Sequence, residues 1–251
     1  MRTCIVIPHH NHPDAIGGVV ASLKLLALPC LIVDDGSDPR AHEVVARIAE
    51  REDWVTLLRL DVNQGKGGAV MAGFDALLAQ GFTHALQIDA DGQHHPADVP
   101  QLLELSRRHP ESVVTGYAVY DDSVPRARLY GRYLTHVWVW INTLSLRIRD
   151  SMCGLRLYPL APTCAIWRRS HVGRRMDFDM EILVRLSWSG ADIINVPARV
   201  TYPADGVSHF KVFRDNVLIS AMHTRMFFGM LWRLPRLLGR KFGTRPRKVE
   251  A

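Results

Sequence analysis

The 251-residue sequence predicts an α/β fold in which helices cover both faces of a doubly wound, mostly parallel sheet. Two observations indicate this fold. Short runs rich in β-branched residues alternate with helical segments of about 10 to 15 residues. These runs are apolar throughout, as expected for parallel strands that are buried on both faces. The length suits one domain, or one domain with an appendage.

The elements follow in order along the first half of the chain. TCIVIP is a β-branched strand, and the helical spacing after it begins near a proline. CLIVDD is a second apolar run that ends in acids, and the same alternation continues to about residue 117. The predicted strands are residues 3–8, 30–35, 55–60, 85–89 and 112–115, and the predicted helices are residues 13–28, 40–50, 68–80 and 97–109.

Polar signatures stand at the ends of the first four strands, as PHHNH, DDGSD, NQGKGG and DADGQ. In sheets of this kind ligands bind beyond the carboxyl ends of the strands, so we expect one site. Asp, Ser and Gly in DDGSD are equally suited to a turn and a helix cap. NQGKGG suits an anion but lacks the spacing of a Walker loop, and it could be a glycine-rich turn with a surface lysine.

Asp89 and Asp91 end the fourth strand side by side, where their charges repel each other. A divalent cation between them would remove the repulsion, and two hard oxygen ligands together with substrate phosphates suit Mg²⁺ or Mn²⁺. Zinc is not expected, because the nearby histidines have no cysteine partner and match no common structural spacing. The histidines are His9, His10, His12, His94 and His95.

Six motifs in order, across residues 3 to about 203, resemble an inverting family-two glycosyltransferase of the dolichyl-phosphate or polyprenyl-phosphate sugar synthase type. They are IPHHN, VDDGSD, NQGKGGA, DADGQHHP, DSMCGLRLYP and FDMEILVRLSWSG. The resemblance implies the GT-A fold over residues 1–205 and a hexosyltransferase that uses a UDP- or GDP-sugar as donor.

The resemblance also implies roles for individual residues. Base and ribose are expected at Pro8, His10, Asn11, Asp34 and Asp35, the donor near Lys66 and Asp89, the metal at Asp89 and Asp91 with Gln93 close by, and phosphate at Arg156. The chain departs from the family where His10 and His12 replace the usual aromatic residue and acid. A histidine can stack on a base, but His12 cannot supply an acidic contact.

The acceptor decides whether the reaction needs a base. A lipid phosphate has its second pKa near 6 and can attack unaided, provided that arginines clamp it. Arg126, Arg128, Arg132, Arg147, Arg149 and Arg156 are candidates, although such arginines can also simply solvate a helix face. A hydroxyl acceptor would need a base such as Asp179 or Glu181. A structural role is the alternative, because Asp179 and Glu181 suit the first turn of a helix and Glu181 can pair with Arg185.

The formal charge of +6 is concentrated near the C-terminus, where eight Lys/Arg from Arg225 onward face one acid. Large apolar side chains are interleaved with them, so residues 206–251 are predicted to form an interfacial helix pair broken at Pro235. The alternative is a terminal helix packed on the core with a disordered basic end. No stretch reaches the roughly 18 to 20 apolar residues of a membrane span.

We therefore expect a peripheral protein at the cytosolic face of a membrane, with a membrane-associated acceptor. Four cysteines without paired spacing, expected to be free thiols, are typical of a reducing compartment. Two other classes compete. A nucleic-acid-binding protein is disfavoured because no recognition module is evident. A nucleotidyltransferase would share the sheet and the carboxylates, but not the later motifs around Arg156 and Asp179.

Overall fold

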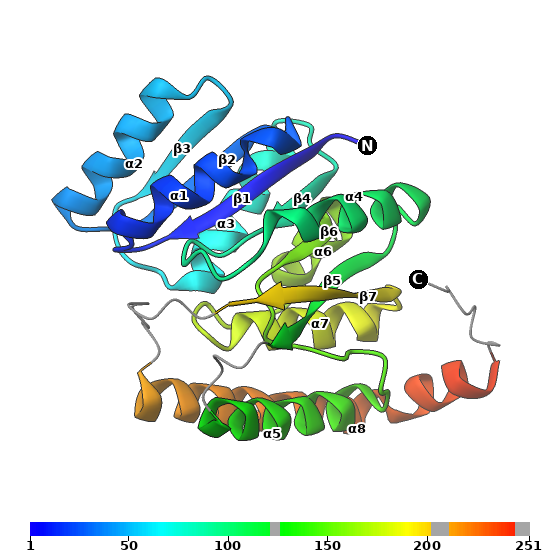
Figure 1. Cartoon of the computed structure of the whole chain (residues 1–251). Coiled ribbons are helices and arrows are strands. Elements are labelled where there is room, and N and C mark those ends of the chain that lie inside the picture. The colour runs from blue at the N-terminus through cyan, green and yellow to red at the C-terminus, as the bar shows by residue number, and fades with distance from the viewer. Residues whose placement is uncertain (121–125, 202–210, 244–251) are drawn as a thin grey trace.

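The computed structural model describes residues 1–120, 126–201 and 211–243, without the side chains of 126–130 and 241–243. Seven strands form one sheet in the order β3-β2-β1-β4-β6-β5-β7 (Figure 1). The strands are β1 Thr3–His9, β2 Cys30–Asp35, β3 Val55–Leu60, β4 His84–Gln87, β5 Val113–Tyr120, β6 Arg156–Pro159 and β7 Ile193–Val200.

The first four strands are parallel neighbours, so their carboxyl ends share one edge of the sheet. β6 is antiparallel to both β4 and β5 and pairs Arg156 with Gln87. Because of this direction, β6 begins at the edge where β4 ends, and Arg156 stands at the base of the predicted site. The doubly wound, mostly parallel sheet predicted from the sequence is confirmed.

Helices cover both faces of the sheet. One apolar core lies beneath α1 Pro13–Leu23, α2 Pro39–Arg51 and α4 Val99–Arg108. The other lies beneath α3 Lys66–Ala79, α6 Leu160–Arg169 and α7 Phe178–Ser189. Short 3₁₀ turns, Lys24–Leu26 and Pro96–Asp98, follow α1 and precede α4, so the predicted helix 97–109 begins as a separate turn.

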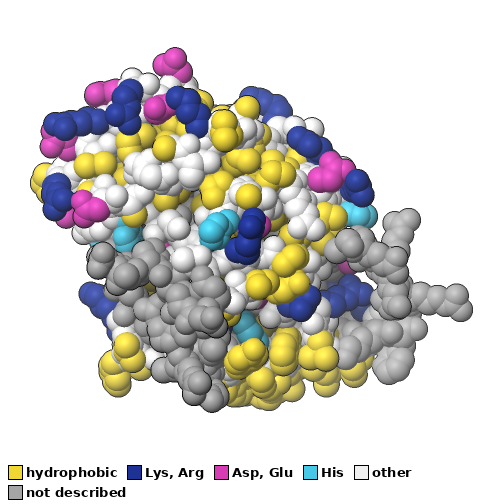
Figure 2. All heavy atoms as spheres, in the orientation of Figure 1, with side chains coloured by type: hydrophobic (Ala, Val, Ile, Leu, Met, Phe, Trp, Pro, Cys, Tyr) yellow, Lys and Arg dark blue, Asp and Glu magenta, His cyan; other side chains and the backbone are white. Residues whose placement is uncertain are grey.

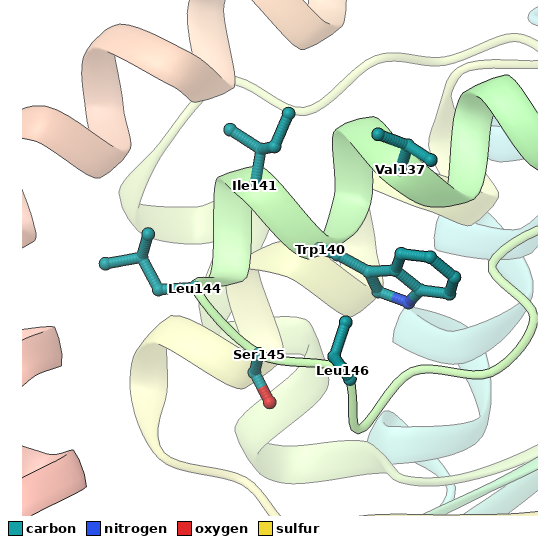
Figure 3. A pocket seen from close by; sticks show the side chains of 6 residues that line it. All are labelled: Val137, Trp140, Ile141, Leu144, Ser145 and Leu146. Atoms are coloured by element: carbon teal, nitrogen blue, oxygen red, sulfur yellow. The ribbon is translucent and has the colours of Figure 1, made fainter.

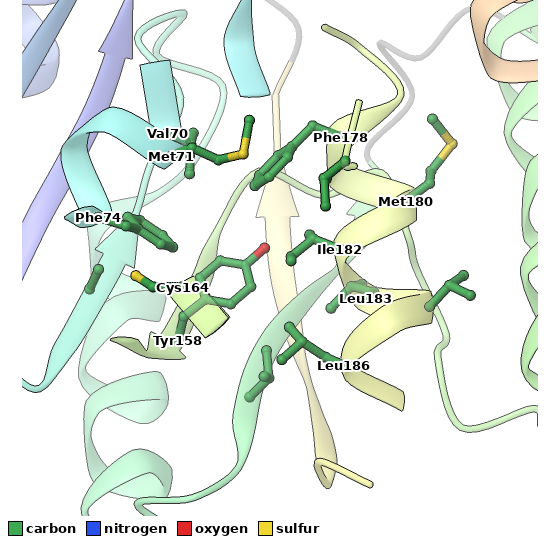
Figure 4. Close-up of a cluster of buried hydrophobic side chains, with 14 of the residues drawn as sticks. Val70, Met71, Phe74, Tyr158, Cys164, Phe178, Met180, Ile182, Leu183 and Leu186 are labelled. Atoms are coloured by element: carbon green, nitrogen blue, oxygen red, sulfur yellow. The ribbon is translucent and has the colours of Figure 1, made fainter. Parts of the chain in front are cut away.

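The second core is built around aromatic and branched side chains (Figure 4). The rings of Phe74 and Tyr158 meet edge to face with their centroids 5.3 Å apart. α7 is buried on nearly all sides, and its residues Ile182, Leu183 and Leu186 are fully buried. α7 is therefore a central helix of the domain, and its first turn is held rigidly against the sheet.

Two long helices, α5 Arg126–Thr143 and α8 Val212–Gly243, lie side by side in an outer layer (Figure 1). Met222, Met226 and Met230 of α8 belong to the core that α7 fills. The predicted break at Pro235 was wrong, because α8 continues through this residue. Met230 and Leu237, on either side of the proline, are both packed in the core, and this packing holds the helix through the missing hydrogen bond. None of the described helices is both long enough and apolar enough to cross a membrane.

Candidate functional site

The loops after β1 and β2 are tied together by side-chain hydrogen bonds. Asn11, with a φ of 52°, accepts from the backbone N–H of Asp38 at 2.9 Å, and its own N–H donates to Ser37 Oγ at 3.1 Å. Asp34 is fully buried 2.8 Å from His42 Nδ1. Burial alone would raise the pKa of Asp34, but hydrogen bonds from Ser37 and His42 outweigh it and hold that pKa below its ordinary value.

Asp35 holds the loop after β3. Its carboxylate accepts the backbone N–H groups of Gln64 at 2.7 Å and Gly65 at 2.8 Å, and the side-chain amide of Asn63 at 3.0 Å. Asp35 is only 2% exposed, and burial raises its pKa. Both acids predicted to hold base and ribose therefore have their oxygens engaged within the protein, where they fix the loops around the site.

Pro8 and His10, also predicted at the base, are half-buried at the end of β1. His10 Nε2 lies 3.5 Å from the side-chain amide of Asn11. These residues stand beside the Asp34 and Asp35 loops, so the structure brings the predicted nucleotide residues together at one edge of the sheet.

Lys66 is the first residue of α3, and its ammonium lies between two carboxylates. Nζ is 2.8 Å from both oxygens of Asp89 and 2.7 Å from Asp179 Oδ2. Burial opposes the charge on Lys66, but the two acids outweigh it and hold the pKa of Lys66 above its ordinary value. This bridge joins the end of β4 to the start of α7.

Arg156 and Gln87 support Asp179 from below. Gln87 Nε2 donates to Asp179 Oδ1 at 3.1 Å, and Arg156 Nη1 donates to the Asp179 backbone carbonyl at 2.6 Å. The other bonds of the guanidinium are to the hydroxyl of Tyr158 and the backbone carbonyl of Ser151. Arg156, expected at a phosphate, has no exposed surface.

Asp91 follows Asp89 at the mouth of the site. Burial, and then the charge of Asp89, raise the pKa of Asp91, while the backbone N–H of Gln93 donates to its Oδ1 at 3.1 Å. The Oδ1 of Asp89 is buried without a well-aligned hydrogen bond. The Lys66 ammonium nevertheless lies 2.8 Å from this oxygen. Two nearby carboxylates fit a cation whose other ligands are phosphate and water. No group of three or more His, Cys, Asp and Glu ligands occurs among the described residues.

Three further residues at the site were not predicted to act there. His94 has a buried Nδ1 without a partner; burial lowers its pKa, and Asp89 and Asp91 oppose that fall. Gly154 leaves room for Asp89, since a Cβ on Gly154 would lie 2.0 Å from Asp89 Oδ2. Arg175 donates to Asn63 Oδ1 at 3.3 Å. His94 and Gly154 could have been chosen from their places in the DADGQHHP and DSMCGLRLYP motifs, whereas Arg175 lies outside the six motifs.

Glu181, a predicted alternative base, is fully buried. Arg185 and Arg225 each approach its carboxylate to 2.6 Å, and the backbone N–H of Gly173 donates to it at 2.9 Å. Arg225 belongs to α8, so Glu181 joins α8 to α7 and to the loop before α7. These contacts indicate a structural role.

Of the arginines predicted at the acceptor, Arg132 is the one on α5 whose side chain is described; the side chains of Arg126 and Arg128 lie outside the described residues. Arg132 Nη2 lies 2.8 Å from Asp150, and its side chain is 17% exposed. Its guanidinium also faces the Tyr120 ring, 5.6 Å from the centroid. Two further arginines follow α5 and have other partners. Arg147 pairs with Asp192, and Arg149 stacks on the ring of Tyr117.

Apolar side chains project outward from α5 and α8, and Figure 2 shows hydrophobic spheres gathered along this lower edge. We call this surface the α5–α8 apolar face; its members include Tyr133, Leu134, Val137, Ile141, Phe213, Phe228, Leu231 and Trp232. A shallow depression of ≈ 450 Å³ opens beside Val137, Trp140 and Leu146 (Figure 3). Trp232 is 86% exposed and Phe213 is 84% exposed, so this face is unusually apolar for a water-facing surface.

Known proteins resemble this chain in sequence. The undecaprenyl-phosphate mannosyltransferase of Micrococcus luteus is 27% identical over 210 residues, covering 78% of this chain and 82% of that protein. The polyprenol monophosphomannose synthase of Mycolicibacterium smegmatis is 26% identical, and the match covers 95% of this chain and 91% of that protein.

A crystal structure of glucosyl-3-phosphoglycerate synthase from Mycobacterium tuberculosis, in complex with Mn²⁺, UDP and glucosyl-3-phosphoglycerate, superposes with a TM-score of 0.60 at 16% identity. The superposition covers 91% of this chain and 78% of the M. tuberculosis enzyme, and it identifies the fold as GT-A. The sequence profile described as Glycosyl transferase family 2 matches residues 4–175. The match covers more than half of the chain, so this protein is a glycosyltransferase and belongs to family 2.

Proposed function

We propose that this glycosyltransferase moves a sugar from a nucleoside-diphosphate donor to a lipid phosphate at a membrane surface. The observation that carries the proposal is the Lys66 bridge between Asp89 and Asp179, set where the loops after four parallel strands meet. The named relatives of M. luteus and M. smegmatis support the acceptor class.

The donor is proposed to lie across this edge of the sheet. Pro8, His10 and Asn11, with the loops that Asp34 and Asp35 hold, would receive the base and ribose. Asp89 and Asp91, with Gln93 close by, would hold Mg²⁺ or Mn²⁺, and this ion would neutralise the charge that grows on the departing diphosphate. Support comes from the proximity of Asp89 and Asp91, whose charges oppose each other, and from the Mn²⁺ complex of the M. tuberculosis enzyme.

The proposed chemistry is a single displacement. An oxygen of the lipid phosphate forms a bond to C1 of the sugar as the bond from C1 to the diphosphate breaks, which inverts the configuration. The attacking phosphate is already anionic at neutral pH, so no proton has to be removed. Lys66 holds Asp89 and Asp179 in place, and Arg156 positions Asp179 from beneath.

The acceptor phosphate is proposed to bind at the start of α5, near Arg126, Arg128 and Arg132. An arginine fork suits phosphate oxygens, and the Arg132 side chain is 17% exposed. A hydroxyl acceptor would need a free base, whereas the oxygens of Asp179 already face Lys66 and Gln87. This arrangement favours the lipid phosphate.

The α5–α8 apolar face is proposed to rest on the membrane that supplies the acceptor, at the cytosolic face. Apolar side chains of this size enter the boundary between headgroups and acyl chains, and basic residues add attraction to anionic lipids. Such a position would bring the start of α5 close to a lipid phosphate.

The proposal is tested by incubating the protein with Mn²⁺, a panel of labelled UDP- and GDP-sugars, and either a short polyprenyl phosphate or the matching polyprenol. We expect labelled lipid from the phosphate alone, with an inverted anomeric centre by NMR. Product from the polyprenol alone would refute the acceptor assignment.

Asp91→Asn removes one proposed metal ligand and should lower turnover at least 100-fold, in line with the several kcal/mol that a metal supplies. The variant should keep the circular dichroism and thermal midpoint of the parent, because Asp91 is partly exposed and its removal relieves repulsion with Asp89. Full activity in this variant would overturn the metal assignment.

A further inference from the structure

Two loops far apart in the sequence form one unit beside the donor site. The backbone N–H of Gly68 donates to the Arg174 carbonyl at 2.9 Å. Gly65 has a φ of 87°, and a Cβ at this position would lie 2.6 Å from the Arg174 carbonyl oxygen and 2.7 Å from Arg175 Cγ. The loop before α7 is therefore fitted closely against the loop that leads into Lys66.

This fit places the guanidinium groups of two consecutive arginines on neutral partners from one loop. Arg174 Nη1 donates to Gln64 Oε1 at 2.8 Å, and Arg175 Nη1 donates to Asn63 Oδ1 at 3.3 Å. Arg174 is exposed and Arg175 is half-buried. In the part of the chain that the structure describes, no ion pair neutralises either group.

Four other cations near the site, all with described side chains, are already paired. Lys66 is held by Asp89 and Asp179, Arg132 by Asp150, and Arg185 and Arg225 by Glu181. Two acids lie near the arginine pair, and both are engaged by backbone N–H groups. Asp177 accepts the backbone N–H of Arg175 at 3.1 Å, and Asp35 accepts those of Gln64 and Gly65. Two adjacent positive charges repel each other, and an anion between them would remove that repulsion.

We propose that Arg174 and Arg175 form a phosphate-binding pair that takes the diphosphate of the donor. This inference rests on the proposed function and deepens it, because it adds two cationic side chains of the loop before α7 to the groups that receive the diphosphate. The donor is favoured over the acceptor because the pair is fixed to the Asn63–Gly65 loop that Asp35 holds. Arginine forks match phosphate oxygens in geometry as well as charge.

The test measures the affinity of UDP and GDP by calorimetry with Mn²⁺ present, and of uridine and guanosine as uncharged comparisons. Arg174→Gln and Arg175→Gln should each weaken nucleotide binding about tenfold, and the double variant further, while nucleoside binding stays unchanged. Arg174→Lys with Arg175→Lys should recover part of the affinity, because charge returns without the fork.

Arg107→Gln with Arg108→Gln is the matched control, since it removes two adjacent exposed arginines from α4. This control should bind nucleotide like the parent. Equal nucleotide affinity in the parent and the Arg174/Arg175 double variant would overturn the inference alone. A loss confined to the KM for polyprenyl phosphate would overturn the donor assignment. If the parent bound no nucleotide and transferred no sugar, the proposed function would fail as well.

Discussion

At the residue scale, the position of the Asp89 carboxylate depends on a glycine from a distant part of the chain. Gly154→Ala would place a Cβ 2.0 Å from Asp89 Oδ2, so the carboxylate must leave the position in which it contacts Lys66. We expect kcat/KM to fall roughly 100-fold, as for other misplacements of about 1 Å, and stability to fall by about 1 to 3 kcal/mol. Transfer assays and urea unfolding measure the two effects.

Gly18→Ala is the control for this variant. Gly18 lies within α1, and a Cβ there would meet nothing within 4 Å. Alanine in a helix is more stable than glycine by about 0.5 to 1 kcal/mol, so this variant should be slightly stabilised and fully active. Normal activity in Gly154→Ala would mean that the Asp89 position is not important for transfer.

Sequence reasoning at this scale identified which residues gather, but not what each one contacts. The strand-end motifs correctly brought Asp34, Asp35, Lys66 and Asp89 to one edge, because the edge follows from parallel strand order. The bonds of Asp35 to Gln64 and Gly65 depend on loop geometry that residue types do not specify. Glu181 meets Arg225, 44 residues away, only after α8 has packed.

At the element scale, α5 and α8 meet around a buried histidine. His223 is 4% exposed, lies 3.2 Å from the Asn142 side chain, and stacks on Trp138. Its Nε2 has no hydrogen-bond partner. Burial lowers the pKa of His223 to about 4, so the folded protein keeps this ring neutral.

This pairing predicts a pH dependence of stability. The folded pKa of His223 lies below the ordinary 6.5, so the unfolded chain binds the proton first, and stability is lost as the pH falls from about 6.5 to about 4. The free energy of unfolding falls by about 1.4 kcal/mol for each pH unit in that range, which amounts to a loss on the order of 3 kcal/mol. His223→Gln removes the titrating ring, so the difference in unfolding free energy between parent and variant should shrink toward pH 4. A difference that stays constant with pH would contradict the prediction.

The strands and helices were largely predictable because their signals are local. The apolar runs gave β2 and β3 to the residue, and the proline near the start of α1 marks its beginning. β6 was not predicted, since Arg156–Pro159 is short and its antiparallel place between β4 and β5 depends on the whole sheet. The continuity of α8 through Pro235 likewise depends on core packing that no local pattern reveals.

At the scale of the whole molecule, helix packing connects the sheet edge to the α5–α8 apolar face. α8 packs on α5 and α7, and the start of α7 contributes Asp179 to the Lys66 bridge. Arg225 of α8 also pairs with Glu181, which belongs to α7. The outer layer is therefore fixed relative to the site, and a surface that bound α8 would also set the approach of a lipid to Lys66 and Asp89.

The molecule is accordingly expected to bind anionic vesicles through this face. Phe228→Ser combined with Trp232→Ser removes two side chains that are 65% and 86% exposed, so the fold should be unaffected. Full burial of such a side chain is worth about 1.5 to 3 kcal/mol, and the double variant should therefore partition at least tenfold less into vesicles that contain phosphatidylglycerol. Leu25→Ser is the control, because Leu25 is 96% exposed in the turn after α1 and lies outside this face. Sedimentation with vesicles measures the binding of both variants. Equal binding by the double variant and the parent would exclude the α5–α8 apolar face as the contact. Weaker binding, with a raised KM for polyprenyl phosphate and an unchanged affinity for UDP or GDP, would connect the face to acceptor delivery.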